Sequence, residues 1–513
     1  MKGVSAFKGN RNAILRCSTL YGIAVRGVQM ISMRLFPDQP FAETEEFLGN
    51  LAQGDLISHD LHFAIQFNLA RNDVIKGKIL GNPSAYDKVA KLFLLPGPPL
   101  QLRSESTIDF ATQFRSDEVF LESISRPYAG LERSPEAVGA VAEFHLGNLT
   151  FTTERPSADI SGRKVTFLLT GPTIAWDARW VAEVSHSGER KIIYPNPKLE
   201  LQNESLFEIQ ILPRFFYATT LSSEGHALNT HVLSVQFSTV TSTTELSDSD
   251  FLSQAKSTID DLLLLSSLIS RRWTAWYAYL LETPRLLEWH LKRTRDCSSK
   301  EPEHHETLLA PGQIRPFLTK ALHRLRTLRS QHFDLFMPIV YCVAGSEAKH
   351  VEEKFTSLFL ALERIKDLFA RSNTAYNQIL ADPEFHSLTR NICDLVRQNV
   401  DSKGRRKLFY EKVRELNRPS FLSVLEAFLQ KQDILWKDLY PTNATFSLIK
   451  TRDKLFHSSD IIDHQELILE LYRLRALVER LLLSLLGSRD FSRAPISYIH
   501  DNITKTRPNG NAV

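Results

Sequence analysis

The hydrophobic pattern of this chain changes its period along the sequence, and this change constrains the fold more than any other feature. Between Leu61 and Leu69 apolar and polar residues alternate, as they do in a strand that buries one face. Beyond about residue 314 apolar residues recur three and four positions apart, as in Phe355, Leu358 and Leu362, which is the spacing of an amphipathic helix. This order predicts an α+β protein in which a β-rich sandwich or barrel-like domain precedes an all-α helical bundle.

Shorter segments of the same two kinds extend this prediction. Further strands are expected between Gly, Pro, Asn and Asp turn residues, at Val74–Leu80, Val89–Leu95, Val165–Thr170, Leu206–Leu212 and Val232–Val240. Helices are expected at Phe251–Ser270, Ile314–Phe336, His350–Ser372, Glu384–Val400, Arg406–Glu415, Ser420–Gln432, Ala444–Phe456 and Asp463–Leu486. An aromatic group follows the first of these helices, and we expect its rings to pack in the core rather than to stack on bases: Trp273, Trp276, Tyr277 and Tyr279.

Changes in composition divide the chain into five predicted segments. The first is rich in basic residues, and Arg16 and Arg26 interrupt any hydrophobic signal region. We expect this leader to be disordered, or to precede a true start at Met30 or Met33. The predicted segments are the leader at 1–40, a β-rich domain at 41–295 that ends in a helix and the aromatic group, a linker at 296–312, the helical bundle at 313–488 and a polar tail at 489–513.

Charge and hydropathy argue against two classes of function. The 62 basic and 59 acidic residues leave a formal net charge of +3, which provides no overall attraction to nucleic acid or to a membrane. The longest apolar runs, near Leu262–Ile269 and Leu481–Leu486, are shorter than the roughly 20 residues that a membrane span requires. We therefore expect no transmembrane helix and no membrane partner.

Cysteines and histidines do not indicate a metal site. The adjacent His304 and His305 lie in the predicted linker without a carboxylate or cysteine at a ligand spacing. We expect a solvated loop there, with no metal and no other cofactor. The four cysteines are far apart and predict neither a disulfide framework nor a zinc site, so we expect a reducing cytoplasm: Cys17, Cys297, Cys342 and Cys393.

A candidate for chemistry lies between Ile449 and Ser459, where four residues separate Arg452 from His457 in a region of predicted helix. An arginine can hold a phosphate through two hydrogen bonds at any physiological pH. A histidine exchanges protons near neutrality. Together the two residue types supply what cleavage of an RNA phosphodiester needs without a metal ion.

Spacing alone does not single out this pair. In a straight helix, five residues turn the chain by about 140°, so the two side chains of such a pair do not share a face. An active site then needs the arginine to bend, or the helix to end within the motif. Three other pairs have the same or nearly the same spacing: Arg285 with His290, Arg326 with His332, and Arg493 with His500.

Context distinguishes Arg452 and His457 from the other pairs. They lie in the penultimate predicted helix, before a long helix with an apolar stripe, and an earlier helix contains Ala361-Leu362-Glu363. This arrangement resembles the HEPN (higher eukaryote and prokaryote nucleotide-binding) family, whose signature is an arginine, usually a polar residue, and a histidine a few positions later. The polar residue here is Asp453, where asparagine is commonest in the family.

The β-rich first half resembles that of the ApeA-like branch, which joins such a domain to a carboxy-terminal HEPN bundle. The sequence Gly54-Asp55-Leu56-Ile57 before the Leu61 strand is similar to the start of that domain. The resemblance implies a metal-independent endoribonuclease that acts in the cytoplasm in anti-phage defence, abortive infection or a toxin system. It also implies an RNA substrate, a sensing or restraining role for the β-rich domain, and a phage-derived activator.

Carried onto this sequence, the resemblance implies that Arg452 and His457 form the catalytic pair and that Asp453 orients it. A carboxylate at this position can hold Arg452 or raise the proton affinity of the histidine. The resemblance further implies a homodimer, or a higher even-numbered homo-oligomer, in which two copies of the motif face one cleft.

Other residues are candidates for supporting roles. Glu363 is expected either to face the motif helix or to form a salt bridge on its own helix, for instance with Lys366. Basic residues are candidates for RNA phosphate contacts or, alternatively, for a solvated charged surface. They are Lys403, Arg405, Arg406 and Lys407 in a predicted loop, and Arg324, Arg326 and Arg329 on a predicted helix.

Two other functions stay open on the sequence. The helical half can be a catalytically inactive HEPN module that binds RNA, a nucleotide or a partner protein. The β-rich half can be a ligand receptor whose helical half only dimerises. The position of Arg452 and His457 within the bundle favours the ribonuclease.

Overall fold

A computed structural model describes most of the chain. The predicted leader, the polar tail and the pair His304 and His305 lie outside the described residues. The described residues are 42–68, 75–93, 98–104, 112–125, 139–154, 162–171, 176, 181–184, 190–193, 198–201, 207–221, 227–239, 246–294, 307–310, 312–373, 376, 378–440, 447–457 and 463–488.

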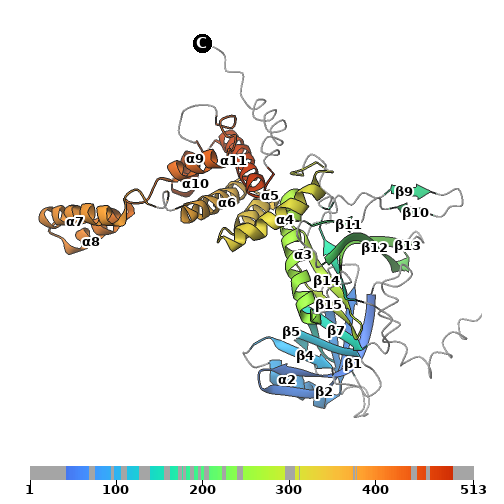
Figure 1. Ribbon diagram of the computed structural model, residues 1–513. Coiled ribbons are helices and arrows are strands. Elements are labelled where there is room, and N and C mark those ends of the chain that lie inside the picture. The colour runs from blue at the N-terminus through green and yellow to red at the C-terminus, as the bar shows by residue number, and fades with distance from the viewer. Residues whose placement is uncertain are drawn as a thin grey trace, which may run out of the picture.

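The protein is a mixed α and β molecule with strands in its amino-terminal half and helices in its carboxy-terminal half (Figure 1). The first strands form a six-stranded antiparallel barrel, closed by pairing between its fifth and sixth strands. The barrel strands, in spatial order, are β4 (Leu100–Ser104), β1 (Ala42–Gln53), β2 (Leu56–Asn68), β3 (Ile75–Gly81), β6 (Gly139–Leu146) and β5 (Thr112–Ile124).

Alternation in β2 decides which of its side chains fill the barrel. Leu61, Phe63 and Ile65 are each 0% exposed, whereas His62 and Gln66 between them point away from the core. The predicted strand from Leu61 is therefore confirmed. On the neighbouring β3 a glycine is required, because a Cβ at Gly77 would lie 2.2 Å from the ring of Phe144 on β6.

One predicted strand is wrong. The sequence from Val89 to Leu95 was expected to be extended, but residues to Phe93 belong to the helix α2 (Pro83–Phe93). Proline is favoured in the first turn of a helix, and the Asn82 side chain accepts a hydrogen bond from the backbone N–H of Ala85. Val89 and Leu92, three positions apart, are both buried against the barrel, so a helical rather than an alternating pattern applies.

A second, open sheet continues from β5 of the barrel. The predicted strands in this region are confirmed by β8, β12 and β13. Strands β9 (Val181–Val184) and β10 (Arg190–Ile193) form a separate pair. The strands of the open sheet, in spatial order from the barrel, are β7 (Asn148–Glu154), β15 (Leu286–Lys292), β14 (Ala275–Glu282), β8 (Lys164–Thr170), β13 (Ala227–Thr239), β12 (Phe207–Leu221) and β11 (Lys198–Leu199).

The helix α3 (Asp248–Ser270) packs against the open sheet and links it to the helical half. Its start is capped by the Ser247 hydroxyl, which accepts from the N–H of Asp250. Trp276 and Tyr279 of β14 are buried in the same core as α3, and the indole of Trp276 donates to Asp260 of α3 at 2.8 Å. The prediction that these aromatic rings pack in the core is confirmed.

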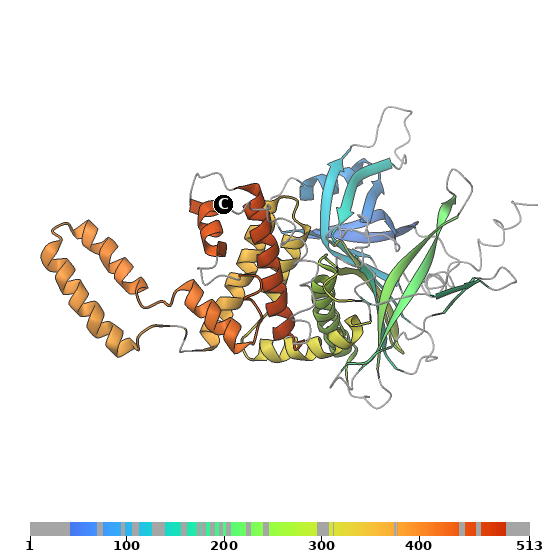
Figure 2. The ribbon, with the colours of Figure 1, turned by 90° about the horizontal axis from the view of Figure 1, so that it is seen from above.

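The helical half contains a packed bundle and a projecting hairpin (Figure 2). The predicted helix Ile314–Phe336 is shorter than expected: α4 ends at Ser330, and a turn separates it from a further helix, α5. The hairpin of α7 (Asp382–Asn399) and α8 (Lys403–Glu415), which we call the arm, extends away from the bundle. The bundle helices are α4 (Ile314–Ser330), α5 (Phe336–Glu347), α6 (Val351–Ser372), α9 (Phe421–Lys431), α10 (Ser447–His457) and α11 (His464–Leu485).

No helix in the described part of the chain has the length and apolar content needed to cross a membrane.

Candidate functional site

The predicted catalytic residues lie on α10, a short helix that packs against α6 and α11. Leu448 and Thr451 face inward and are 0% and 1% exposed. The Ser447 hydroxyl donates to the carboxylate of Glu470 on α11 at 2.6 Å. Buried residues and this hydrogen bond therefore fix α10 in the bundle, and they leave its opposite side partly open.

Arg452 lies next to the inward-facing Thr451 and is half-buried. Its Nη1 atom donates to Oδ1 of Asp453 at 2.8 Å. Its guanidinium carbon lies 5.8 Å from the ring centre of Phe359 on α6 and 5.6 Å from that of Phe456, at distances where a cation is attracted to an aromatic ring. An aromatic pair and a carboxylate thus hold a permanently charged group at the surface of the bundle.

His457 is the last residue of α10, so the whole motif lies within the helix. Two residues five positions apart on one helix are turned by about 140° from each other and do not share a face. The side chain of His457 lies outside the described residues.

Asp453 was expected to hold Arg452 or to raise the proton affinity of the histidine. The structure shows the first contact, since the carboxylate of Asp453 accepts a hydrogen bond from Arg452. The next residue, Lys454, forms an ion pair with Glu466 of α11, with 3.5 Å between the nitrogen and the carboxylate oxygen. Glu363 lies one helical turn after Phe359, and therefore on the same side of α6 as the ring near Arg452. Within the described residues Lys366 pairs with Asp367, rather than with Glu363.

The structure separates Arg452 and His457 from the pairs with similar spacing. Arg285 lies in the turn between β14 and β15, and His290 lies within β15. The side chain of Arg326 donates to Asp261 of α3, and His332 has a φ of 60° in the turn after α4. Neither of these pairs lies within a single helix; Arg493 and His500 lie outside the described residues.

The predicted basic loop is wrong: Lys403, Arg405, Arg406 and Lys407 belong to the first turns of α8. Arg406 donates to the carbonyl oxygens of Val400 and Asp401, so it stabilises the end of the hairpin. The other three side chains are exposed. All four belong to α8, which lies in the projecting arm, away from α10 (Figure 1).

The basic residues of α4 have structural partners. Arg326 and Arg329 bind the two carboxylate oxygens of Asp261, at 3.1 and 2.9 Å. Arg324 donates to the carbonyl oxygen of Leu485. Contacts with α3 and α11 thus account for side chains that were candidates for RNA phosphate contacts.

Sequence reasoning missed a group of buried charges behind α10. Glu470 of α11 is 1% exposed and accepts from Arg473 at 2.5 Å. Burial, and secondarily the charge of Glu470, raises the pKa of Tyr440 well above its usual value. Farther along α11, Arg480 is 0% exposed and forms two hydrogen bonds with Asp438. The signal was present, because these charges interrupt the apolar stripe of α11.

The β-rich half contains a polar surface beside α3. The ring of His290 stacks on Tyr279, with 5.0 Å between ring centres, and the Thr150 hydroxyl lies 2.8 Å from its Nδ1 atom. Burial, together with the charges of Lys256 and Lys292, lowers the pKa of His290 to about 4. Burial also lowers the pKa of Lys292 to about 8. His290 is therefore neutral at physiological pH.

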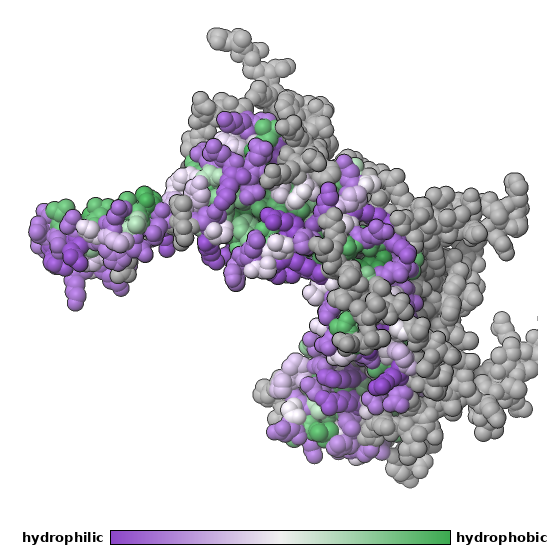
Figure 3. All heavy atoms as spheres, in the orientation of Figure 1, coloured by the Kyte–Doolittle hydropathy of each residue, from purple (hydrophilic) through white to green (hydrophobic). Residues whose placement is uncertain are grey.

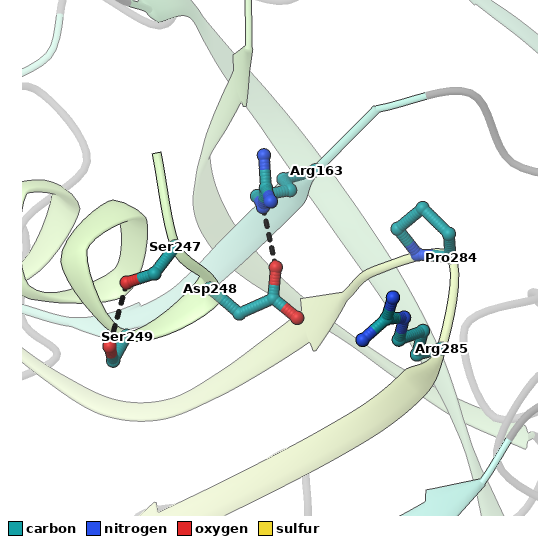
Figure 4. A pocket seen from close by; sticks show the side chains of 6 residues that line it. All are labelled: Arg163, Ser247, Asp248, Ser249, Pro284 and Arg285. Atoms are coloured by element: carbon teal, nitrogen blue, oxygen red, sulfur yellow. Dashed lines mark hydrogen bonds and ion pairs between the residues drawn. The ribbon is translucent and has the colours of Figure 1, made fainter. Parts of the chain in front are cut away.

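An open pocket of about 610 Å³ lies where α3 begins, beside the turn between β14 and β15. Asp248 forms an ion pair with Arg163, and its carboxylate lies between the side chains of Arg163 and Arg285 (Figure 4). Two serines complete the polar side of this pocket, Ser247 and Ser249. The two arginines among its described lining residues can form hydrogen bonds to an anionic ligand.

Comparison with family models, with curated proteins and with solved structures found no match to this chain. Its function is therefore inferred from its own residues, above all from those around Arg452.

Proposed function

We propose that this chain is a metal-independent endoribonuclease of the HEPN type, with Arg452 and His457 as its catalytic pair. One observation carries the proposal. The Arg452 guanidinium is held between Phe359, Phe456 and Asp453 on the partly open side of α10, and the same helix ends at His457. A fixed cation and a proton-exchanging residue that meet at one site are the minimum that RNA cleavage requires.

The reaction uses the nucleophile that RNA carries. The 2′-oxygen attacks the adjacent phosphorus while the bond from phosphorus to the 5′-oxygen breaks. His457 takes the proton from the 2′-hydroxyl or gives one to the departing 5′-oxygen, and Arg452 stabilises the negative charge that grows on the phosphate oxygens. The products are a 2′,3′-cyclic phosphate and a 5′-hydroxyl, and DNA resists because it lacks the 2′-hydroxyl.

Asp453 serves this reaction by orienting Arg452. An arginine side chain loses rotamer freedom when it binds phosphate. The hydrogen bond to Asp453 and the rings of Phe359 and Phe456 restrict that freedom beforehand, so less is lost when the substrate arrives. Glu363, on the α6 face that also holds Phe359, supports the same region.

A second copy of the bundle completes the site in this proposal. Residues about 140° apart on one helix do not converge easily, whereas a two-fold axis brings the same motif twice to one cleft. Arg452 of one copy then acts with His457 of the other. A homodimer, or a higher even-numbered assembly, is therefore part of the proposed function.

The proposed setting is anti-phage defence in the cytoplasm, by abortive infection or as a toxin. The β-rich half would sense a phage-derived activator or restrain the nuclease. The pocket between Arg163 and Arg285 is a candidate for the sensing site, because its arginines suit an anionic ligand.

Expression of the wild type, Arg452→Ala and His457→Ala tests the proposal. Growth and RNA integrity are measured with and without phage, and purified proteins are tested on labelled RNA with and without a chelator. Arg115→Ala is the control, because this arginine of barrel strand β5 is 58% exposed and belongs to neither proposed site. Equal behaviour of all four proteins would refute the ribonuclease. RNA binding without cleavage by the wild type would instead favour the inactive HEPN module.

A further inference from the structure

The arm buries few of its own apolar residues. Helix α7 has 18 residues and none of them is buried, although helices of this size depend on tertiary packing for most of their stability. Hydrogen bonds fasten the base of the arm. There Asn417 exchanges hydrogen bonds with the backbone of Leu380 at 2.7 and 3.0 Å.

Large apolar side chains are exposed on the arm. Figure 3 shows hydrophobic surface gathered along one side of it. Leu388 and Leu395 are seven positions apart and so share one side of α7. Phe409 of α8 is related in the same way to Leu416, the residue that follows that helix. The exposed residues are Ile379 (60%), Leu388 (43%), Leu395 (59%), Leu408 (64%), Phe409 (50%) and Leu416 (57%). A contiguous apolar surface of this kind marks a site of protein association.

The two helices of the arm begin with opposite charges. The first turn of α7, at the base, contains Asp382 and Glu384. The first turn of α8, at the far end, has no acidic residue and contains Lys403, Arg405 and Arg406. This basic turn is at the positive end of the α8 dipole, where cations are unfavourable unless a negative group lies nearby.

We propose that the arm pairs with the arm of a second copy of this chain, antiparallel and about a two-fold axis. In such a pair the far end of each arm lies beside the base of the other. The basic first turn of α8 then contacts the acidic first turn of α7 in the partner. The two-fold axis repeats this contact, so it occurs twice in the pair. A two-fold interface requires this kind of self-complementary surface, and a single arm has it.

The size of the arm suits this role. A helix of 18 residues is about 27 Å long, and two hairpins that pair over this length form a four-helix arrangement with their leucines inside. The area buried is roughly that of a standard protein interface, of the order of 1,200 Å². Nucleic acid at the basic turn is the competing occupant, but it would leave the leucines of α7 uncovered.

Pairing of the arms is independent of the proposed catalytic dimer. The two bundles would lie at opposite ends of the paired arms, so this contact does not itself bring Arg452 of one copy to His457 of another. Both contacts together would give the higher even-numbered assembly. Loss of one contact is therefore distinguishable from loss of the other.

The first test is the mass of the full chain in solution, measured by light scattering and sedimentation. Leu388→Glu with Leu395→Glu is expected to halve the mass of the assembly and leave the circular dichroism unchanged, because both residues are exposed. Leu48→Glu with Leu56→Glu is the matched control, since these barrel leucines are 47% and 51% exposed, and it is expected to keep the wild-type mass. A monomeric wild type, or an unchanged mass in the arm variant, overturns the proposal.

The second test uses charge reversal. Asp382→Lys with Glu384→Lys, and separately Arg405→Glu with Lys407→Glu, are expected to weaken self-association at least tenfold. All four changes in one chain are expected to restore it, because the acidic and basic turns meet only between copies. Failure of this rescue overturns the antiparallel pairing. The antiparallel pairing is also overturned if no arm variant changes the mass of the chain while Arg405→Glu with Lys407→Glu weakens the binding of labelled RNA. That result would assign the basic turn to nucleic acid.

Discussion

The guanidinium of Arg271 donates two hydrogen bonds, of 2.7 and 2.6 Å, to the carboxylate of Glu479. Arg271 ends α3 in the left-handed conformation, with a φ of 55°, and the side chain of Glu479 in α11 is 0% exposed. The pair therefore joins the helix on the open sheet to a central helix of the bundle. Two parallel hydrogen bonds offset part of the cost of removing both charges from water.

Loss of this pair should destabilise the whole molecule. Glu479→Ala leaves Arg271 without its carboxylate and removes the negative neighbour of Arg475, whose pKa burial already lowers. We expect the free energy of unfolding to fall by about 3 to 5 kcal/mol, as for other broken buried ion pairs, measured by urea denaturation. Glu415→Ala, which breaks an exposed pair with Lys412, is the control and should leave the midpoint unchanged.

Replacing Arg452 by lysine tests whether the shape of the cation matters. Lysine keeps the charge but cannot form two parallel hydrogen bonds to a phosphate. We expect Arg452→Lys to lower kcat for RNA cleavage by about 10- to 100-fold, a smaller loss than alanine causes. The measurement is single-turnover cleavage of labelled RNA. Arg115→Lys, at an exposed arginine of the barrel, should keep the wild-type rate, and equal rates in both variants would contradict the assigned role.

The contact between Arg452 and Asp453 predicts how the site responds to changes at Asp453. Asparagine still offers an oxygen to the guanidinium, so Asp453→Asn should retain most activity. Asp453→Ala frees Arg452 and should lower kcat/KM by about tenfold, in the range of lost positioning contacts. Activity assays on the two variants decide this, and an equally large loss in the asparagine and alanine variants would argue that the negative charge itself is needed.

His290 predicts a loss of stability in acid. Its pKa is lowered to about 4 in the folded protein by burial and by two lysines, whereas the unfolded chain has the ordinary value of about 6.5. Between these values the unfolded state binds a proton that the folded state does not, so stability falls as the pH falls through this window. The contribution is about 3 kcal/mol.

Substitution of His290 isolates this effect. His290→Gln keeps a polar side chain beside Thr150 but cannot be protonated in this range. Melting temperatures measured at intervals between pH 7 and pH 4 should fall less steeply in the variant than in the wild type. Parallel curves for the two proteins would mean that His290 is not the group responsible.

The buried thiol of Cys342 should be inert in the folded protein. Burial raises its pKa to about 12, so almost no thiolate is present near neutrality. With iodoacetamide at pH 8, peptide mapping should find Cys342 unmodified in native protein and modified in denaturant. Cys393 on α7 is less buried and serves as the accessible comparison. Labelling of native Cys342 at the rate of Cys393 would contradict the packing of α5.

The local pattern of apolar residues predicted many strands and helices correctly. The alternation in β2 and the spacing of apolar residues in α6 and α11 each depend on residues within one or two turns of one another. The assignment of catalytic chemistry to Arg452 and His457 stays a prediction. The pattern failed at Val89 and Leu92, because two apolar residues three positions apart fit either a short strand or a helix.

Pairing and burial were decided by the tertiary structure. Closure of the barrel pairs β5 with β6, and extension of the sheet pairs β5 with β7. Neither pairing can be predicted from the hydrophobic pattern of neighbouring residues. The charges of Glu479 and Arg480 do interrupt the apolar stripe of α11, but only the tertiary structure supplies the distant partners that enclose them. A sequence pattern determines which faces of an element are apolar, whereas long-range packing determines which partner covers each face and which charges leave water.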